Sequence, residues 1–299
     1  MRVRSLLAIT LAVVLFVSWL SIILYPSVQD FMGANPFWNG VRDFGRRFDA
    51  EMLPSLDQLT AEPEGNVLVV IPYLPYQDGE LQPLVDFVSG GGTLLLMDDY
   101  GYGNQVLGAM GLDMKFDSDP LLDPYLNYRN QEFPVIVELA PEFKDAGIKE
   151  LVLNHATALI TTNRSETLAR SSDMSFLDSN GNAAWDIGES KGPFPVAVRA
   201  TVGSGTVVAV SDPSIIISGM VGRGDNEKFL TQLISQAGES PRVSLDASHL
   251  PKAPLDSAKD VWVMVRQQLV LPYSQALLVG AVLTLSFMPR FIGAKRSRN

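Results

Sequence analysis

Two long apolar segments without a charged residue, one near each end of the chain, constrain most strongly what this sequence can fold into. They are the 20-residue segments 6–25 and 269–288. A helix of 20 residues spans about 30 Å, which is the thickness of the hydrocarbon core of a bilayer. The sequence therefore predicts one transmembrane helix at each end of the chain.

Basic residues flank both segments on the side of the chain ends. Arg2 and Arg4 precede the first segment, and four basic residues follow the second one, namely Arg290, Lys295, Arg296 and Arg298. The positive-inside rule then predicts a two-pass protein of the plasma membrane, with both termini cytoplasmic and residues 26–268 extracytoplasmic. The alternatives are a cleaved signal peptide for the first segment and a buried core helix for the second.

The part of the chain between these segments is strongly acidic. All 33 Asp and Glu residues lie within positions 26–268, but only 17 of the 23 Lys and Arg residues do, so that this part has a net charge of −16. Such a charge excludes nucleic acid as an expected partner and suits a metal ion or a cationic partner. The simplest interpretation of this negative charge is that it keeps the domain soluble.

The counts of cysteine and histidine exclude several kinds of chemistry. The chain has 0 Cys and 2 His. Disulfides, thiolate nucleophiles and cysteine-ligated metals are therefore excluded, as are zinc sites built on several imidazoles. We interpret His155 and His249 as structural, and no motif indicates a nucleotide or redox cofactor.

Changes in composition along the chain predict six parts. They are an N-terminal transmembrane anchor (1–25), a juxtamembrane connector (26–65), an α/β domain (66–237), a linker and helix (238–268), a C-terminal transmembrane helix (269–288) and a basic cytoplasmic tail (289–299).

A strand–helix–strand pattern opens the α/β domain. Residues 67–71 and 93–97 are continuous apolar runs, and residues 80–89 between them place apolar side chains on one helical face. Runs that are apolar throughout are typical of strands buried on both faces. We therefore predict two adjacent parallel strands joined by a right-handed helical crossover.

The end of the domain has a second recognisable pattern. Two apolar runs flank Gly203-Ser204-Gly205, which indicates a hairpin, and Asp225 is placed to cap a helix. Residues 135–139 and 151–161 are further strand candidates. The whole pattern predicts an α/β fold with a flavodoxin-like sheet flanked by helices.

Polar and aromatic side chains follow the predicted strands at their carboxyl ends, where open α/β sheets bind ligands. The candidates for ligand binding are Tyr73, Asp98, Asp99, Tyr100, Asp212 and Ser214. Paired carboxylates can act as acid and base or can hold a cation. Aspartates in turns also bind backbone amides, and we favour that interpretation because no nucleophile–base pair accompanies them.

Two stretches of the domain resemble a known family. The sequence PYLPYQDGELQPLVDFVSGGGTLLLMDDYGYGNQVLGAMGL and the later run GPFPVAVRATVGSGTVVAVSDPSIIISGM are similar to the membrane-associated family called domain of unknown function 4350. The matching residues include Glu80, Leu84, Phe87, Val88, Gly91, Gly92, Asp98, Asp99, Tyr100, Gly101, Gly103 and Asn104. The resemblance covers most of residues 66–236 and adds Asn104 to the ligand-binding candidates.

The resemblance implies a relation to class I glutamine amidotransferase-like folds and a partner among MoxR-type ATPase systems. Those amidotransferases use a cysteine on a sharp turn after a strand, where this chain reads MDDYGYGN. Because the chain has 0 Cys, a glutaminase reaction is excluded. A fold without its catalytic residues favours a binding or scaffold role.

Residues 178–189, DSNGNAAWDIGE, have the spacing of a calcium-binding loop. The predicted ligands are Asp178, Asn180, Asn182, the backbone carbonyl of Ala184, Asp186 and Glu189. Ala183 stands where such loops usually have glycine. The alternative is a polar loop held by hydrogen bonds between its side chains and its backbone.

Two functions follow as hypotheses. The first is a non-catalytic, membrane-anchored extracytoplasmic domain that binds a ligand or a protein partner within an envelope assembly, with a structural Ca²⁺ ion in the 178–189 loop. The second is a metal-assisted hydrolase that uses Asp98, Asp99 and Asp212. Converging carboxylates favour the second, whereas carboxylates that accept hydrogen bonds from backbone amides favour the first.

Overall fold

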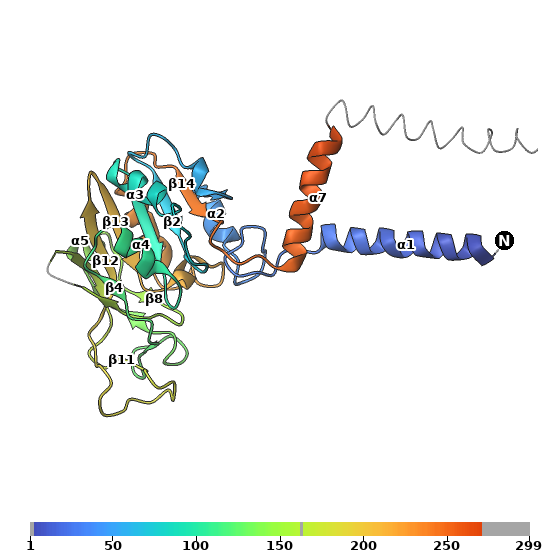
Figure 1. Ribbon diagram of the computed structural model, residues 1–299. Coiled ribbons are helices and arrows are strands. Elements are labelled where there is room, and N and C mark those ends of the chain that lie inside the picture. Colours follow the sequence, from blue (N-terminus) through green and yellow to red (C-terminus); the bar gives the residue numbers. More distant parts are fainter. Residues whose placement is uncertain (1–2, 162–163, 271–299) are drawn as a thin grey trace, which may run out of the picture. The chain divides into compact units, whose positions relative to one another are not determined.

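The computed structural model describes residues 3–161 and 164–270, and the chain divides into two compact units. The larger unit is Ser27–Pro251. The smaller one combines residues 1–26 with residues from 252 onward, and its described helices are α1 (Val3–Leu24) and α7 (Pro254–Val270). Figure 1 shows the ribbons of α1 and α7. Within this smaller unit, Trp19 and Trp262 meet edge to face with ring centroids 5.3 Å apart.

The described residues contain no helix that is both long and apolar enough to cross a membrane. This finding contradicts the predicted transmembrane helix at 6–25 and the predicted two-pass plasma-membrane localisation, whereas the predicted helix at 269–288 lies almost wholly outside the described residues. Helix α7, which leads into the second segment, has 17 residues and carries Asp256, Lys259, Asp260 and Arg266. Residues 271–288 of that segment lie outside the described residues. Absence of charge over a run of residues was therefore an insufficient basis for the membrane prediction.

A mixed sheet of eight strands forms the centre of the larger unit. Its order is β1 (Glu51–Leu53), β14 (Val243–Asp246), β2 (Val67–Val70), β3 (Thr93–Met97), β13 (Gly205–Val210), β12 (Pro195–Val202), β10 (Glu166–Arg170) and β7 (Glu138–Leu139). The first five strands pair in parallel, and the last three continue the sheet by antiparallel pairing. The predicted α/β class is confirmed. The sheet order differs from the flavodoxin-like one, because three antiparallel strands extend one side.

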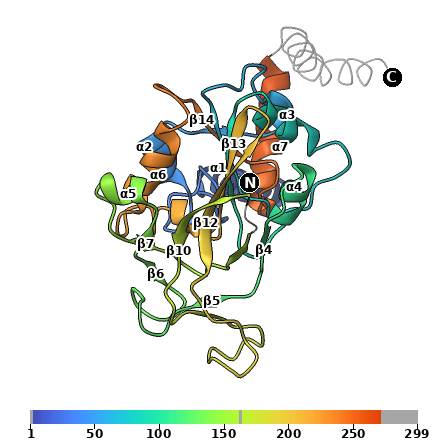
Figure 2. The ribbon, with the colours of Figure 1, turned by 90° about the vertical axis from the view of Figure 1, so that its left-hand side faces the viewer.

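Helices cover both faces of this sheet (Figure 2). Helices α3 (Gln82–Ser89) and α4 (Gly103–Ala109) pack on one face, where Leu68 and Val70 of β2 point. Helices α2 (Arg42–Phe48), α5 (Pro141–Asp145) and α6 (Asn226–Ser235) pack on the other face, where Val67 and Val69 point. Successive side chains of a strand point to opposite faces, so a strand between two helical layers must be apolar throughout.

The predicted strand–helix–strand unit is confirmed. Strands β2 and β3 are adjacent and parallel, with Val67 opposite Thr93 and Val69 opposite Leu95. Leu84 and Val88 of α3 are fully buried, and the helix ends at Ser89 before Gly91, whose φ is +105°. The later hairpin is confirmed as well, since β12 and β13 pair antiparallel around Gly203.

Short elements complete the larger unit. The 3₁₀ helices are Leu56–Gln58 and Pro213–Ile216. Three two-stranded sheets join β5 (Leu121–Leu122) to β11 (Phe176–Leu177), β4 (Lys115–Phe116) to β9 (Leu159–Ile160), and β6 (Val135–Ile136) to β8 (Leu151–Val152). Each of the two predicted strands is thus divided into two short strands: residues 135–139 form β6 and β7, and residues 151–161 contain β8 and β9.

The compact unit extends beyond the limits that composition indicates. Strand β1 comes from the predicted connector, and β14 comes from the predicted linker, yet both lie in the central sheet. Phe44 of α2 is also fully buried in the core. Residues 27–65 and 238–251 therefore belong to the body of the α/β unit.

Candidate functional site

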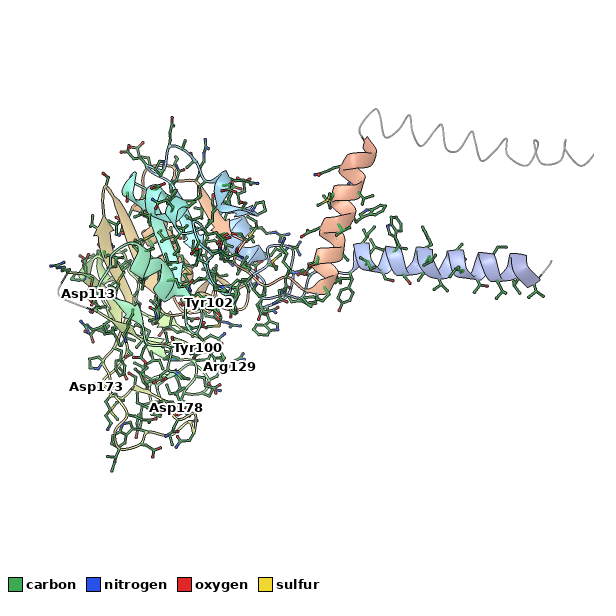
Figure 3. The ribbon with its side chains drawn as sticks, in the orientation of Figure 1. Tyr100, Tyr102, Asp113, Arg129, Asp173 and Asp178 are labelled. Atoms are coloured by element: carbon green, nitrogen blue, oxygen red, sulfur yellow. The ribbon has the colours of Figure 1, made fainter. Side chains whose placement is uncertain are left out.

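The carboxyl ends of β2, β3 and β13 bring together side chains from three separate segments. Tyr73 follows β2, Asp98 and Asp99 follow β3, and Asp212 follows β13. Parallel strands end at the same edge of a sheet, and this arrangement places the predicted candidates at one site. Figure 3 shows Tyr100 and Tyr102, from the loop after β3, on this part of the domain.

Asp98 organises the loop between β3 and α4. Its Oδ1 accepts hydrogen bonds from the amides of Asp99 (3.0 Å) and Gly101 (2.8 Å), and its Oδ2 accepts one from Gly103 (2.7 Å). Both glycines are required by these close approaches. A Cβ on Gly103 would lie 2.6 Å from Asp98 Oδ2 and 2.7 Å from the ring of Phe116. Asp98 thus accepts three backbone hydrogen bonds that hold this loop in shape.

Asp99 and Asp212 are a pair of buried carboxylates that influence each other. Asp99 is 8% exposed and accepts from the amide of Tyr100 at 2.7 Å, while Asp212 is fully buried. Asp212 accepts from the amides of Asn154 (2.7 Å) and Ser214 (2.7 Å). Burial raises the pKa of Asp99 to about 6, with a further contribution from the charge of Asp98. Burial, together with the charge of Asp99, raises the pKa of Asp212 to about 8.

Tyrosines border these carboxylates. Tyr73, Tyr100 and Tyr102 have exposed fractions of 38%, 46% and 40%. Burial and the charges of Asp99 and Asp212 raise the pKa values of Tyr73 and Tyr100, so both hydroxyls stay protonated near neutral pH. The ring of Tyr73 also packs on that of Phe31, with centroids 5.5 Å apart. This edge offers aromatic rings and hydroxyl donors to a ligand.

The last two candidates at this edge hold the chain locally. Asn104 donates to the carbonyl of Phe116 (3.0 Å) and accepts from its amide (2.8 Å), which ties α4 to β4. The amide of Ser214 donates to the side chain of Asp212, which caps the N-terminus of the 3₁₀ helix Pro213–Ile216. Neither geometry is that of an activated nucleophile.

The sequence analysis missed a buried Asp–His pair at the end of β14. His249 Nδ1 lies 2.7 Å from Asp246 Oδ2, and Ser248 Oγ donates to Asp246 Oδ1 at 2.5 Å. The ring of Tyr76 stacks on His249 with centroids 3.8 Å apart, and His249 Nε2 lies 3.6 Å from a carboxylate oxygen of Glu80. The only signal in the sequence was the Asp-x-x-His spacing, within a segment assigned to a linker.

The 178–189 loop is held by its own hydrogen bonds. Asp178 accepts from the amides of Gly181 (2.9 Å), Asn182 (3.2 Å) and Ala183 (2.8 Å). Asp186 Oδ2 accepts from the side-chain amides of Asn180 (2.8 Å) and Asn182 (2.7 Å), and Glu189 accepts from the amides of Ser179 (2.9 Å) and Asp186 (3.0 Å). Across the described residues, no group of three or more His, Asp or Glu side chains is placed to hold a metal ion.

Solved structures with similar folds are distant from this chain. The mmIFT52 N-terminal domain matches with a TM-score of 0.46 and 13% identity, over 57% of this chain and 78% of that one. A cytoplasmic protein from Salmonella typhimurium LT2 matches with a TM-score of 0.41 and 16% identity, over 64% and 80%. A beta-galactosidase from Bacillus circulans sp. alkalophilus matches with a TM-score of 0.33 and 12% identity, over 55% of this chain and only 23% of that one. These TM-scores carry no argument about function.

A family match is more informative. No curated protein matches the sequence. The family described as "Domain of unknown function (DUF4350)" matches residues 34–234, which is about two thirds of the chain and includes every strand of the central sheet except β14. The chain belongs to the DUF4350 family.

Proposed function

We propose that the domain is a non-catalytic binding module, whose protein partner docks on the edge where β2, β3 and β13 end. One observation carries this proposal. Asp98, Asp99 and Asp212, the residues that a hydrolase at this edge would use, each accept hydrogen bonds from backbone amides. Carboxylates in such bonds shape loops, and they are poorly available as metal ligands or as bases.

The surface chemistry of this edge supports a protein partner. Tyr73, Tyr100 and Tyr102 expose between 38% and 46% of their surface around the buried carboxylates. Tyrosine is enriched in interfaces because its ring buries a large area and its hydroxyl still finds a hydrogen-bond partner. By family resemblance, the partner proposed here is a MoxR-type ATPase. The relation to glutamine amidotransferase-like folds likewise stays a prediction.

The partner is tested with the full chain and the MoxR-type ATPase of the same organism, by isothermal titration calorimetry. Tyr73→Ala combined with Tyr100→Ala is expected to weaken binding by about tenfold or more, because central aromatic residues dominate interface energies. Tyr125→Ala is the matched control, since Tyr125 is 74% exposed and lies in another loop. Binding that is equal in both variants would contradict the proposed docking edge.

The non-catalytic character is tested separately. The purified chain is offered chromogenic esters, glycosides, phosphate esters and peptides, with and without divalent metal ions, and no turnover is expected. Asp99→Asn and the exposed Asp173→Asn serve as a matched pair. A turnover that Asp99→Asn abolishes and Asp173→Asn preserves would establish the hydrolase alternative instead.

A further inference from the structure

A cavity of about 430 Å³ lies beside the Asp212 loop, within the larger unit. Its walls come from four parts of the chain that are far apart in sequence, namely Trp38, the loop 128–133, the segment 154–155 and the loop 219–223. None of the tyrosines of the proposed docking edge lines it. A volume in this range is typical of pockets for small molecules.

Positive charge gathers in this cavity although the surrounding sequence is strongly acidic. The two positive charges are those of Arg129 and Arg223, which line the cavity beside the ring of His155, and no Asp or Glu is among the lining residues. Within residues 3–161 and 164–270, neither arginine has a carboxylate within 4.0 Å, whereas His155 Nε2 lies 3.5 Å from Glu132 Oε2. Two guanidinium groups without an acidic partner make this cavity locally basic, in a part of the chain whose net charge is −16.

Both arginines lie against the same aromatic ring. The guanidinium carbons of Arg129 and Arg223 lie 5.4 Å and 5.6 Å from the centroid of Tyr128. Arg223 is also held in place, because it donates to the Tyr128 hydroxyl (3.1 Å) and to the carbonyl of Gly219 (3.2 Å). A guanidinium has five N–H donors, so these bonds leave donors of Arg223 for a ligand. Figure 3 places Arg129 on the outside of the domain, where a ligand can reach it.

The remaining walls combine aromatic rings with the hydrogen-bonded segment 154–155. Trp38 is 68% exposed, and the ring of Phe133 meets that of His155 edge to face at 6.0 Å. His155 has a φ of +58°, and its amide donates to the carbonyl of Glu132 at 2.9 Å. The amide of the preceding Asn154 donates to the buried Asp212. These bonds hold the cavity in shape without a ligand.

We propose that this cavity binds a small organic oxyanion, in which a carboxylate or phosphate group is attached to an aromatic ring. The oxyanion accepts hydrogen bonds from Arg129 and Arg223, and the ring packs against the aromatic walls that Trp38 and Phe133 supply. Guanidinium groups match the geometry of both oxyanions, so this shared chemistry defines the class of ligand. The site is separate from the proposed docking edge and holds or fails independently of it.

The test titrates the full chain with phenyl phosphate and with benzoate by isothermal titration calorimetry, which also distinguishes the two oxyanions. We expect saturable binding of at least one of them at one site per chain. Inorganic phosphate has the oxyanion without the ring, and benzyl alcohol has the ring without the oxyanion. Both are expected to bind about tenfold more weakly or not at all.

Arg129→Ala is the decisive variant, because the Arg129 side chain is exposed and, within the described residues, its one recorded contact is with the ring of Tyr128. It is expected to weaken binding by about tenfold or more, with an unchanged melting temperature. Arg46→Ala, an exposed arginine of α2 outside the cavity, is the matched control and is expected to bind like the wild type. Tyr128→Phe removes one bond to Arg223 and keeps the ring, so a smaller loss is expected.

Three results obtained with the probes and with Arg129→Ala would overturn the proposal. They are no binding of phenyl phosphate or benzoate at millimolar concentration, binding of benzyl alcohol as tight as that of the anions, and binding that Arg129→Ala leaves unchanged. A loss of affinity in the Tyr73→Ala, Tyr100→Ala variant would place the ligand at the docking edge and would equally contradict this site.

Discussion

At the scale of single residues, the buried carboxylates make the stability of the protein depend on pH. In the unfolded chain an aspartate titrates near 3.9, whereas in the folded protein the pKa of Asp99 is about 6 and that of Asp212 about 8. The folded state therefore binds more protons than the unfolded state between these values. Stability is then expected to fall as the pH rises from about 4 to about 8.

Asp99→Asn tests this dependence, because the amide oxygen can still accept from the amide of Tyr100. The variant is expected to be less sensitive to pH between about 4 and 6. Above pH 6 it is expected to be more stable than the wild type by about 1–3 kcal/mol, since no charge is buried. Urea unfolding at a series of pH values measures both effects. Parallel stability curves for the variant and the wild type would show that Asp99 titrates normally.

Two glycines of α4 form a second test at this scale. Gly103→Ala is expected to destabilise the protein by about 1–3 kcal/mol, because the new Cβ would lie 2.6 Å from Asp98 Oδ2. Gly108→Ala is its matched control on the same helix, since no atom lies within 4 Å of the new Cβ. The second change is expected to stabilise the helix by about 0.5–1 kcal/mol. Chemical unfolding of both variants checks the opposite signs.

At the scale of elements, the spacing of polar residues in the 178–189 loop fits both a calcium-binding loop and a loop held by its own hydrogen bonds. The positions that suit calcium ligands are also those from which Asp178, Asp186 and Glu189 bond to nearby amides. Calcium binding therefore requires these carboxylates to exchange amide donors for the ion. Asp178 is 5% exposed and accepts from three backbone amides, so its removal would destabilise the loop even without calcium.

Glu189→Gln is thus the suitable variant for testing calcium. Millimolar Ca²⁺ is expected to stabilise the wild type by about 1–2 kcal/mol if the loop is a weak site with a Kd of about 10⁻⁴–10⁻³ M. The variant keeps an oxygen to accept from the amide of Ser179 but lacks the charge, and its melting temperature is expected not to respond to Ca²⁺. Differential scanning calorimetry with Ca²⁺ and with chelator measures the shift. Identical curves for the wild type in both conditions would mean that the loop is only a turn.

At the scale of the whole molecule, the limits of the folding unit follow from the sheet. Strand β14 lies between β1 and β2, so that the segments at both ends of the unit meet in one sheet. A fragment of residues 27–251 is expected to unfold cooperatively as an independent domain, because it contains the complete sheet and both apolar clusters.

A fragment of residues 66–237 is the matched comparison. It lacks β14 and β1, and it leaves one edge of β2 without its partner, although β2 is buried along its whole length. Unpaired backbone groups and exposed apolar side chains are expected to prevent its folding. Circular dichroism measures whether each fragment is folded, and urea unfolding measures whether it unfolds cooperatively. Cooperative unfolding of the shorter fragment would show that β14 is dispensable.

The sequence by itself determined the local units of this protein. Strands β2 and β3 with α3 between them, and the β12–β13 hairpin, depend on contacts between neighbouring segments and carry their own periodicity and turn residues. The loop role of Asp98 was predictable for the same reason, because an aspartate in a turn bonds to amides a few residues away.

Only the tertiary structure decided the rest. Strand β14 has four residues, of which Ser244 and Asp246 are polar, so nothing local distinguishes it from a linker, and its place in the sheet depends on β1 and β2. The cavity that holds Arg129 and Arg223 likewise combines side chains that lie about 94 positions apart. Such features depend on packing between segments that are distant in sequence, and the free energy of that packing cannot be estimated from a short stretch of residues.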